Sequence, residues 1–135
     1  MAGKGETVLE RWFEEVWNQR RLDTIHELLT SESVCIVDDG PIKGPEEFRQ
    51  RVFDPFLAAF PDLKVEVKGV ISDGDQVAVR WEATGTHTGE MPGLKASQKP
   101  VEFRSITWSR VVDGKLAEGW QSSNIPEVFR SLNQE

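Results

Sequence analysis

Cysteine, histidine and tyrosine are scarce or missing in this chain of 135 residues, which has one cysteine, two histidines and no tyrosine. A single thiol, on Cys35, forms no intramolecular disulfide and cannot build a zinc site from thiolates. His26 and His87 are too few for the paired-histidine sites that hold many metals, and no tyrosine hydroxyl is present to act as a catalytic acid. The sequence therefore excludes disulfide-stabilised scaffolds and predicts no metal site.

Long apolar runs and an excess of positive charge are missing as well. No run approaches the roughly 18 apolar residues of a membrane-spanning helix, and the first 12 residues lack the apolar core of a signal peptide. Sixteen Lys and Arg against 23 Asp and Glu give a net charge of −7, which repels nucleic acids and anionic membranes. We therefore expect a cytoplasmic protein that binds neither nucleic acid nor membrane.

Hydrophobic periodicity predicts three helices in the first half of the chain and one near its C-terminal end. The first is expected near the N-terminus, on the apolar stripe Val8, Leu9, Trp12, Phe13, Val16 and Trp17. A second, short helix is expected over residues 23–29. A third begins at Pro45, and Pro55, which lacks an N–H, is expected to kink or break it. A last helix is expected over residues 127–132.

Five strands are expected, over residues 33–37, 63–72, 76–87, 101–112 and 115–124. Residues 38–41 have turn chemistry, and Asp-Gly turns at 73–74 and 113–114 predict an antiparallel meander. This order predicts an α+β fold with residues 1–135 in one domain, in which helices cover the concave face of a curved, mostly antiparallel sheet. Such a cone encloses a pocket.

Several motifs resemble the SnoaL-like polyketide cyclase (ester cyclase) family of the nuclear transport factor 2-like superfamily. They are FEEVWN at 13–18, AFPDL at 59–63, GDQVAVRW at 74–81, GTHTGE at 85–90 and DGK at 113–115, followed by Glu118 and Trp120. The resemblance implies a cystatin-like, cone-shaped α+β barrel that dimerises through the outer face of its sheet. It also implies ring closure on a polyketide without metal or cofactor, by an aspartate acid/base assisted by a histidine and amides.

The residues that would perform this chemistry are replaced. The resemblance places Gln121 at the aspartate position, Thr107 at the histidine, Ser105 at its partner amide and Cys35 at a first-strand asparagine. An amide cannot transfer the proton. Two functions stay open: a cofactor-free cyclase, isomerase or lyase that uses another base on a small hydrophobic or polycyclic substrate, or a non-catalytic small-molecule binding or accessory protein.

His87 and Asp38 are the candidates for that other base. An imidazole changes protonation near neutral pH, and Asp38 ends the first predicted strand. Each also has a structural interpretation, because turn residues surround both. We expect a pocket with mainly neutral lining, formed by Trp12, Cys35, Trp81, Phe103, Ser105, Thr107 and Gln121.

The opposite face of the sheet carries its own apolar group. Strand alternation places Ile106, Trp108 and Trp120 together on that face, which predicts the interface of a homodimer. Residues 91–99, rich in Pro, Gly, Lys and Ser, join two long strands. They either cap the mouth of the pocket or form a simple hairpin connection.

Overall fold

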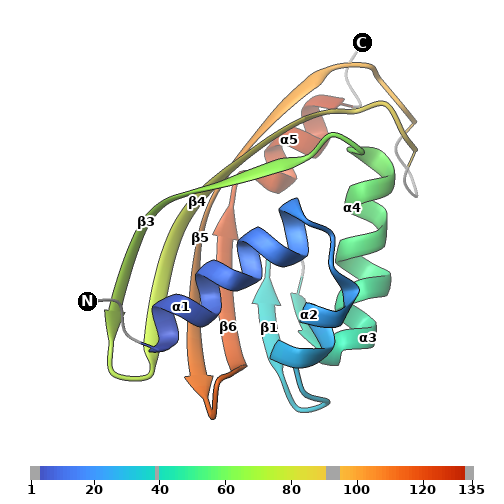
Figure 1. Cartoon of the computed structure of the whole chain (residues 1–135). Helices are drawn as coiled ribbons and strands as arrows, with labels where there is room; N and C mark the ends of the chain where they lie inside the picture. The colour runs from blue at the N-terminus through green and yellow to red at the C-terminus, as the bar shows by residue number, and fades with distance from the viewer. Residues whose placement is uncertain (1–3, 39, 91–94, 133–135) are drawn as a thin grey trace.

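The computed structural model describes residues 4–38, 40–90 and 95–132, in which helices pack on one curved sheet (Figure 1). The helical elements are α1 (Lys4–Arg11), η1 (Trp12–Asn18), α2 (Leu22–Leu28), α3 (Gly44–Phe48), η2 (Arg49–Phe53), α4 (Asp54–Ala59) and α5 (Ile125–Leu132). The strands are β1 (Val34–Val37), β2 (Gly40–Lys43), β3 (Lys64–Asp73), β4 (Gln76–Thr86), β5 (Pro100–Val112) and β6 (Lys115–Ser123). The predicted α+β class is confirmed.

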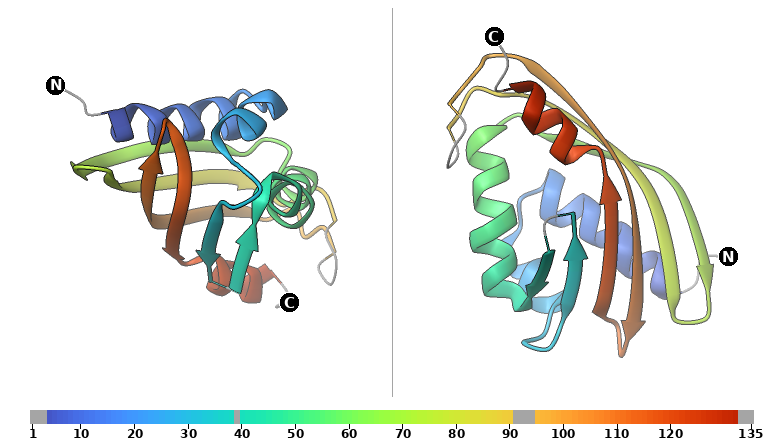
Figure 2. Two further views of the ribbon diagram at one scale, coloured as in Figure 1. Left: turned by 90° about the horizontal axis from the view of Figure 1, so that it is seen from below. Right: turned by 180° about the vertical axis from the view of Figure 1, so that it is seen from behind.

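The described strands form one sheet in the order β2-β1-β6-β5-β4-β3. Strands β3 to β6 make the predicted antiparallel meander, whereas β1 pairs parallel to β6 and antiparallel to β2. β2 and β3 form the two edges, so the sheet is curved and open rather than closed into a barrel. Figure 2 shows the sheet curling around α1 and η1, with α3 and α4 along its side.

Strand β2 corrects the prediction that residues 38–41 form only a turn. Gly40 has φ of 124°, a conformation that favours glycine, and the chain reverses there at once. Pro41 then pairs with Ile36 and Ile42 with Cys35. Proline is tolerated because β2 is an edge strand, where the missing N–H leaves no ladder bond unmade. The last two residues of the predicted turn, Gly40 and Pro41, are therefore also the first two residues of β2.

The helix was expected to kink or break at Pro55. It does not break there: α3, η2 and α4 follow one another as one continuous helix (Figure 1). The segment η2, just before Pro55, is wound as a π-helix, and the N–H of Asp54 donates to the carbonyl of Arg49 five residues earlier. A wider turn makes room for the pyrrolidine ring and shifts the hydrogen-bond pattern past the missing donor. The helix thus accommodates proline by a local change of winding.

The concave face of the sheet holds the core. Along β5 every second side chain from Val101 to Ser109 is buried, as the alternation predicted, and the apolar stripe of α1 and η1 packs against this face. In β6 the register shifts between the pairs Arg110–Glu118 and Val111–Leu116, which leaves Ala117 as an extra residue. This bulge lets Leu116 share the concave face with Gly119 and Gln121.

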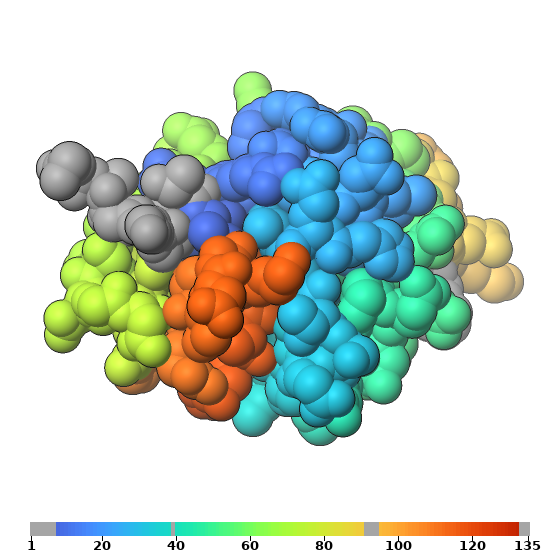
Figure 3. All heavy atoms as spheres, turned by 60° about the horizontal axis from the view of Figure 1, so that its bottom comes forward, coloured from blue at the N-terminus to red at the C-terminus, as the bar shows by residue number. Residues whose placement is uncertain are grey.

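The β5–β6 turn and the segment between α2 and β1 lie side by side at one end of the molecule (Figure 3). Lys115 Nζ donates to the carbonyl of Glu27 at 2.6 Å, and Ser33 Oγ donates to the carbonyl of Leu116 at 2.6 Å. These bonds tie the helical layer to the sheet. Within the described ranges, no helix is long and apolar enough to cross a membrane.

Candidate functional site

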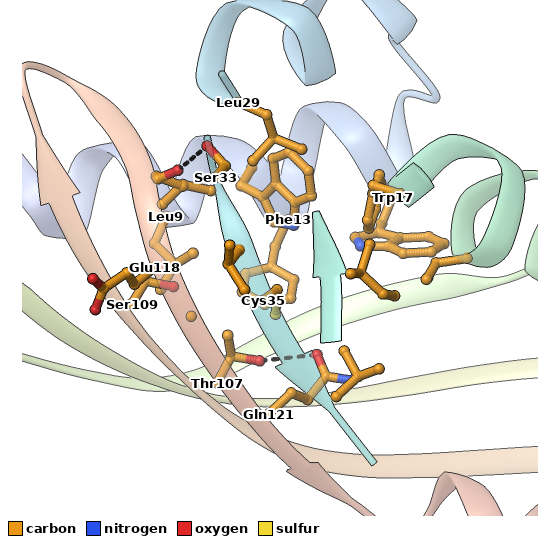
Figure 4. A pocket seen from close by; sticks show the side chains of 18 of the residues that line it. Leu9, Phe13, Trp17, Leu29, Ser33, Cys35, Thr107, Ser109, Glu118 and Gln121 are labelled. Atoms are coloured by element: carbon orange, nitrogen blue, oxygen red, sulfur yellow. Dashed lines mark hydrogen bonds between the residues drawn. The ribbon is translucent and has the colours of Figure 1, made fainter. Parts of the chain in front are cut away.

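A cavity lies between the helices and the concave face of the sheet, with about 100 Å³ of room for the centres of water molecules (Figure 4). The helical side of its lining is apolar and mainly aromatic, formed by Leu9, Trp12, Phe13, Trp17, Leu29, Phe48, Val52 and Phe56. The sheet side contains smaller and more polar residues, among them Cys35, Thr107, Ser109, Gly119 and Gln121. An apolar wall with a few polar groups is typical of small-molecule sites.

A chain of two hydrogen bonds crosses the sheet side of the cavity. Trp81 Nε1 donates to Thr107 Oγ1 at 2.9 Å, and Thr107 Oγ1 donates to Gln121 Oε1 at 3.2 Å (Figure 4). Trp81 and Thr107 are buried, and Gln121 is half-buried. No described protein atom accepts a hydrogen bond from Gln121 Nε2, so this amide keeps two free donors in the cavity lining.

Three further donors of the lining have no described protein partner. They are the Ser109 hydroxyl and the indole N–H groups of Trp12 and Trp17, whose residues are only 4%, 8% and 8% exposed. Figure 4 shows the Trp17 indole nitrogen on the side of the ring that faces the cavity. Among the described side chains only His87 Nε2 is both enclosed and unpartnered, so these three donors border accessible space and are open to an acceptor supplied from outside the chain.

Two ionisable residues, Cys35 and Glu118, take part in the lining. Burial raises the pKa of the Cys35 thiol to about 11, which keeps it neutral and a poor nucleophile near pH 7. Glu118 Oε1 accepts a hydrogen bond from Arg110 Nη2 at 2.9 Å, and its carboxylate points away from the cavity (Figure 4). The described lining therefore turns no carboxylate toward the interior.

Gly119 keeps the floor of the cavity open. It pairs with Cys35 in β1 and with Ser109 in β5, so it lies between two side chains of the lining. A Cβ atom on Gly119 would meet Cys35 Sγ at 3.3 Å and Ser109 Oγ at 3.5 Å. Any longer side chain would occupy space that is now empty.

The structure places five of the seven predicted pocket residues in the lining: Trp12, Cys35, Trp81, Thr107 and Gln121. Phe103 and Ser105 lie outside it, farther along β5 toward α5. The Phe103 ring packs 6.2 Å from the Phe129 ring of α5, and Ser105 Oγ donates to the carbonyl of Ser122 at 3.1 Å. Both side chains therefore already have partners within the protein.

The two candidate bases also lie outside the lining. His87 is fully buried, with its ring 5.5 Å from Phe60, and the N–H of Ser97 donates to His87 Nδ1 at 3.2 Å. Ser97 Oγ also lies 2.9 Å from Nδ1, and His87 Nε2 has no partner among the described residues. Asp38 is exposed, and its Oδ1 accepts from the N–H of Ser123 at 3.2 Å. Both side chains act in local structure here.

The predicted cap over residues 91–99 falls partly outside the described residues, because 91–94 are not described. The remaining residues, 95–99, do not line the cavity. Ser97 and Gln98 instead bond to His87: the N–H of Gln98 donates to the His87 carbonyl at 2.8 Å. The described part of this connection therefore continues the β4–β5 hairpin.

Several lining residues were not in the predicted set. Ser109 shares the strand alternation of Thr107, and Trp17 shares the helical stripe of Trp12, so the sequence contained a signal for both. Ile42 was missed because its strand was interpreted as a turn. Gly119 has no side chain, so its role appears only once β1, β5 and β6 are placed side by side.

Known proteins resemble this chain over nearly its full length. It is 23% identical to aklanonic acid methyl ester cyclase DauD of Streptomyces sp. (strain C5) over 129 residues, 93% of this chain and 80% of that protein. A SnoaL-like protein from Jannaschia sp. CCS1 superposes with a TM-score of 0.87 at 23% identity, covering 98% of this chain and 93% of that chain. IdmH from Streptomyces antibioticus superposes with a TM-score of 0.80 at 26% identity, covering 96% and 98%. Since the family match spans residues 7–132, the chain belongs to the SnoaL-like polyketide cyclase family.

Proposed function

We propose that the cavity binds a small, hydrophobic, ring-containing molecule. The observation that carries this proposal is an apolar, aromatic-walled cavity whose lining includes hydrogen-bond donors without described partners. The relative DauD is named as a cyclase of aklanonic acid methyl ester, and family membership supports a polycyclic ligand for this chain too.

Between the two functions left open by the sequence, we favour binding without conversion. Gln121 cannot transfer a proton, the Cys35 thiol is neutral near pH 7, and the Glu118 carboxylate is paired with Arg110. His87 and Asp38 lie outside the lining. A molecule in the cavity would thus meet no described side chain suited to acid/base catalysis near neutral pH.

One observation favours cofactor-free cyclase, isomerase or lyase activity as the second candidate. The free donors of Gln121, Ser109 and Trp17 are of the kind that stabilises negative charge developing on a substrate oxygen. Such catalysis would depend on a proton moved by water or by the substrate itself.

Binding and conversion are separated by one experiment with a matched pair of variants. Fused-ring ketones, sterols and aromatic hydrocarbons are screened by thermal shift, and each binder is incubated with the protein and analysed by mass spectrometry. Gly119→Val is expected to abolish binding because its side chain fills the floor, while Gly69→Val, at a strand position with open space, retains it. If none of the screened compounds binds, the proposal is contradicted. If a compound binds and is converted, the conclusion shifts to catalysis.

We also propose that a second copy of the chain covers the outer face of the sheet. Ile106, Trp108 and Trp120 are 54%, 49% and 42% exposed there. The charged residues beside them balance: Arg80 and Arg104 stand against Glu82 and Glu102, and Arg110 pairs with Glu118 of β6. On a chain of net charge −7, a locally neutral apolar patch lets two copies meet there with little charge repulsion.

Light scattering at micromolar concentration tests this interface, and the expected mass is that of a dimer. Trp108→Glu should give monomers, because it buries a charge in the interface. Leu22→Glu, on helix α2 of the helical layer and 36% exposed, is the control away from the outer face and should remain dimeric. A monomeric wild-type chain contradicts the proposal.

A further inference from the structure

We infer that Trp81 and Thr107 are positioning residues, which hold the amide of Gln121 as a hydrogen-bond donor for a carbonyl oxygen of the ligand. The inference rests on the proposed binding function and narrows it to a chemical class. The cavity should select ring ketones and quinones over hydrocarbons of the same shape.

The indole of Trp81 determines which group donates and which accepts in each of the two hydrogen bonds. An indole N–H donates and never accepts, so Thr107 Oγ1 is the acceptor of the 2.9 Å bond from Trp81. The single hydroxyl proton of Thr107 is then available for Gln121 Oε1, 3.2 Å away. The carbonyl end of the Gln121 amide is thereby occupied, and its NH₂ end is left for the cavity.

The opposite orientation of the amide is less favourable. It would turn the NH₂ group toward Thr107 Oγ1, which already accepts from Trp81, and would leave the Thr107 proton without its present acceptor. Thr107 is only 7% exposed, and leaving a buried donor unpaired is unfavourable because its lost bond to water is not replaced. Two buried residues thus set which end of a half-buried amide faces the ligand.

Within the described residues, no atom accepts a hydrogen bond from the NH₂ group of Gln121. Gly119, two residues earlier on β6, has no side chain, and Cys35, beside it on β1, is a neutral thiol. Ser109 on β5 adds a second donor, its hydroxyl group, to the same side of the cavity. A ligand carbonyl, which is a pure acceptor, complements these donors, whereas a hydrocarbon leaves them unpaired.

The test uses 9-fluorenone and fluorene, which share one ring skeleton and differ in a carbonyl against a CH₂ group. Dissociation constants are measured by quenching of tryptophan fluorescence or by calorimetry. Wild-type protein is expected to bind fluorenone about fivefold more tightly or better, the ratio that corresponds to one net hydrogen bond of about 1 kcal/mol. The infrared carbonyl stretch of bound fluorenone is expected to shift to lower wavenumber.

Variants distinguish the donor from the residues that position it. Gln121→Leu should abolish both the preference and the infrared shift while it retains fluorene binding. Thr107→Val should reduce both, because the Gln121 amide is then free to rotate, and Thr107→Ser should restore them because it returns the hydroxyl. Thermal unfolding of each variant, followed by circular dichroism, checks that the chain still folds.

Each outcome has a defined meaning. Equal affinity for the two probes with no infrared shift overturns the carbonyl inference and leaves the binding function in place. A preference that survives in Gln121→Leu assigns the carbonyl to another donor, such as Ser109, and overturns the role of Gln121. Failure of both probes to bind contradicts the binding function and the inference together.

Discussion

The two ends of the concave face differ, although both are rich in aromatic rings. At the end covered by α5, Phe60 and Phe103 pack with ring centroids 5.4 Å apart, and Phe129 lies 6.2 Å from Phe103. At the other end, Trp12 packs 4.9 Å from Phe48 and Trp17 5.9 Å from the same ring. The first group fills the space above the sheet, and the second forms one side of a cavity.

The difference lies in what the sheet presents to the rings. At the filled end β5 contributes Phe103, which reaches the helices. At the hollow end the facing positions are Cys35, Ser109 and Gly119, which are too short to reach them. The tryptophans are held by their neighbours on the helical side, so they do not collapse onto the sheet. Small residues under a braced aromatic layer thus create the cavity.

The largest expected change in the free energy of unfolding comes from removing a ring at the filled end. Phe103→Ala removes a fully buried ring and should lower the free energy of unfolding by about 3–5 kcal/mol. Ser109→Ala, at the same strand face in the hollow end, should change it by less than about 1 kcal/mol, because that hydroxyl has no described partner. Urea denaturation of the two variants measures both values. Equal losses would show that the ends are packed alike.

A second effect tests how the filled end is closed. The N–H of Gly89 donates to the carbonyl of Ala59 at 3.1 Å, and a Cβ on Gly89 would come within 1.7 Å of the carbonyl oxygen of Ala58. Gly89→Ala forces the backbone apart and should cost about 3 kcal/mol of unfolding free energy. Gly69→Ala, with nothing within 4 Å of its Cβ, is the control. A Gly89→Ala protein as stable as the Gly69→Ala protein would contradict this close contact.

A third effect sharpens the description of the hollow end. Burial disfavours the charged thiolate, so the Cys35 pKa is raised from 9.0 to about 11. At pH 8, iodoacetamide should alkylate the folded chain about 100-fold more slowly than the urea-unfolded chain, since two pKa units separate them. The raised pKa also adds stability that is present below pH 9 and is lost as the pH rises toward 11. Equal alkylation rates would show that Cys35 is solvated.

Periodicity predicted most of the fold because each buried stripe repeats with the period of its element. Phe103, Ser105, Thr107 and Ser109 were correctly placed on one face of β5 by alternation alone. Which of them line the cavity depends on what lies above each one. Above Phe103 lie Phe60, 43 residues earlier in the chain, and Phe129 of α5, 26 residues later. Such contacts between distant elements are why Phe103 and Ser105, which were predicted to line the pocket, lie outside the cavity.

The candidate bases show a second limit of sequence reasoning. His87 has the chemistry of a catalytic base, but its surroundings are set by Phe60 of the distant α4 end and by Ser97 across the hairpin. Residue type gives the pKa range of a side chain, whereas its access to a ligand depends on tertiary packing. Gln121, by contrast, was predicted in the pocket from the family resemblance, which assigned it to a site position, and the structure places it in the cavity lining.

The smallest expected effect belongs to Asp38, which lies outside both ends of the concave face. Its carboxylate accepts hydrogen bonds from the N–H and the hydroxyl of Ser123 at the surface, and joins the end of β1 to the end of β6. Asp38→Asn keeps an acceptor for the N–H, so it should lower the free energy of unfolding by less than about 1 kcal/mol. Ligand affinity should be unchanged, because no atom of Asp38 lines the cavity. A large loss of affinity or turnover in this variant, measured beside Gln121→Leu, would instead connect this edge of the sheet to the cavity.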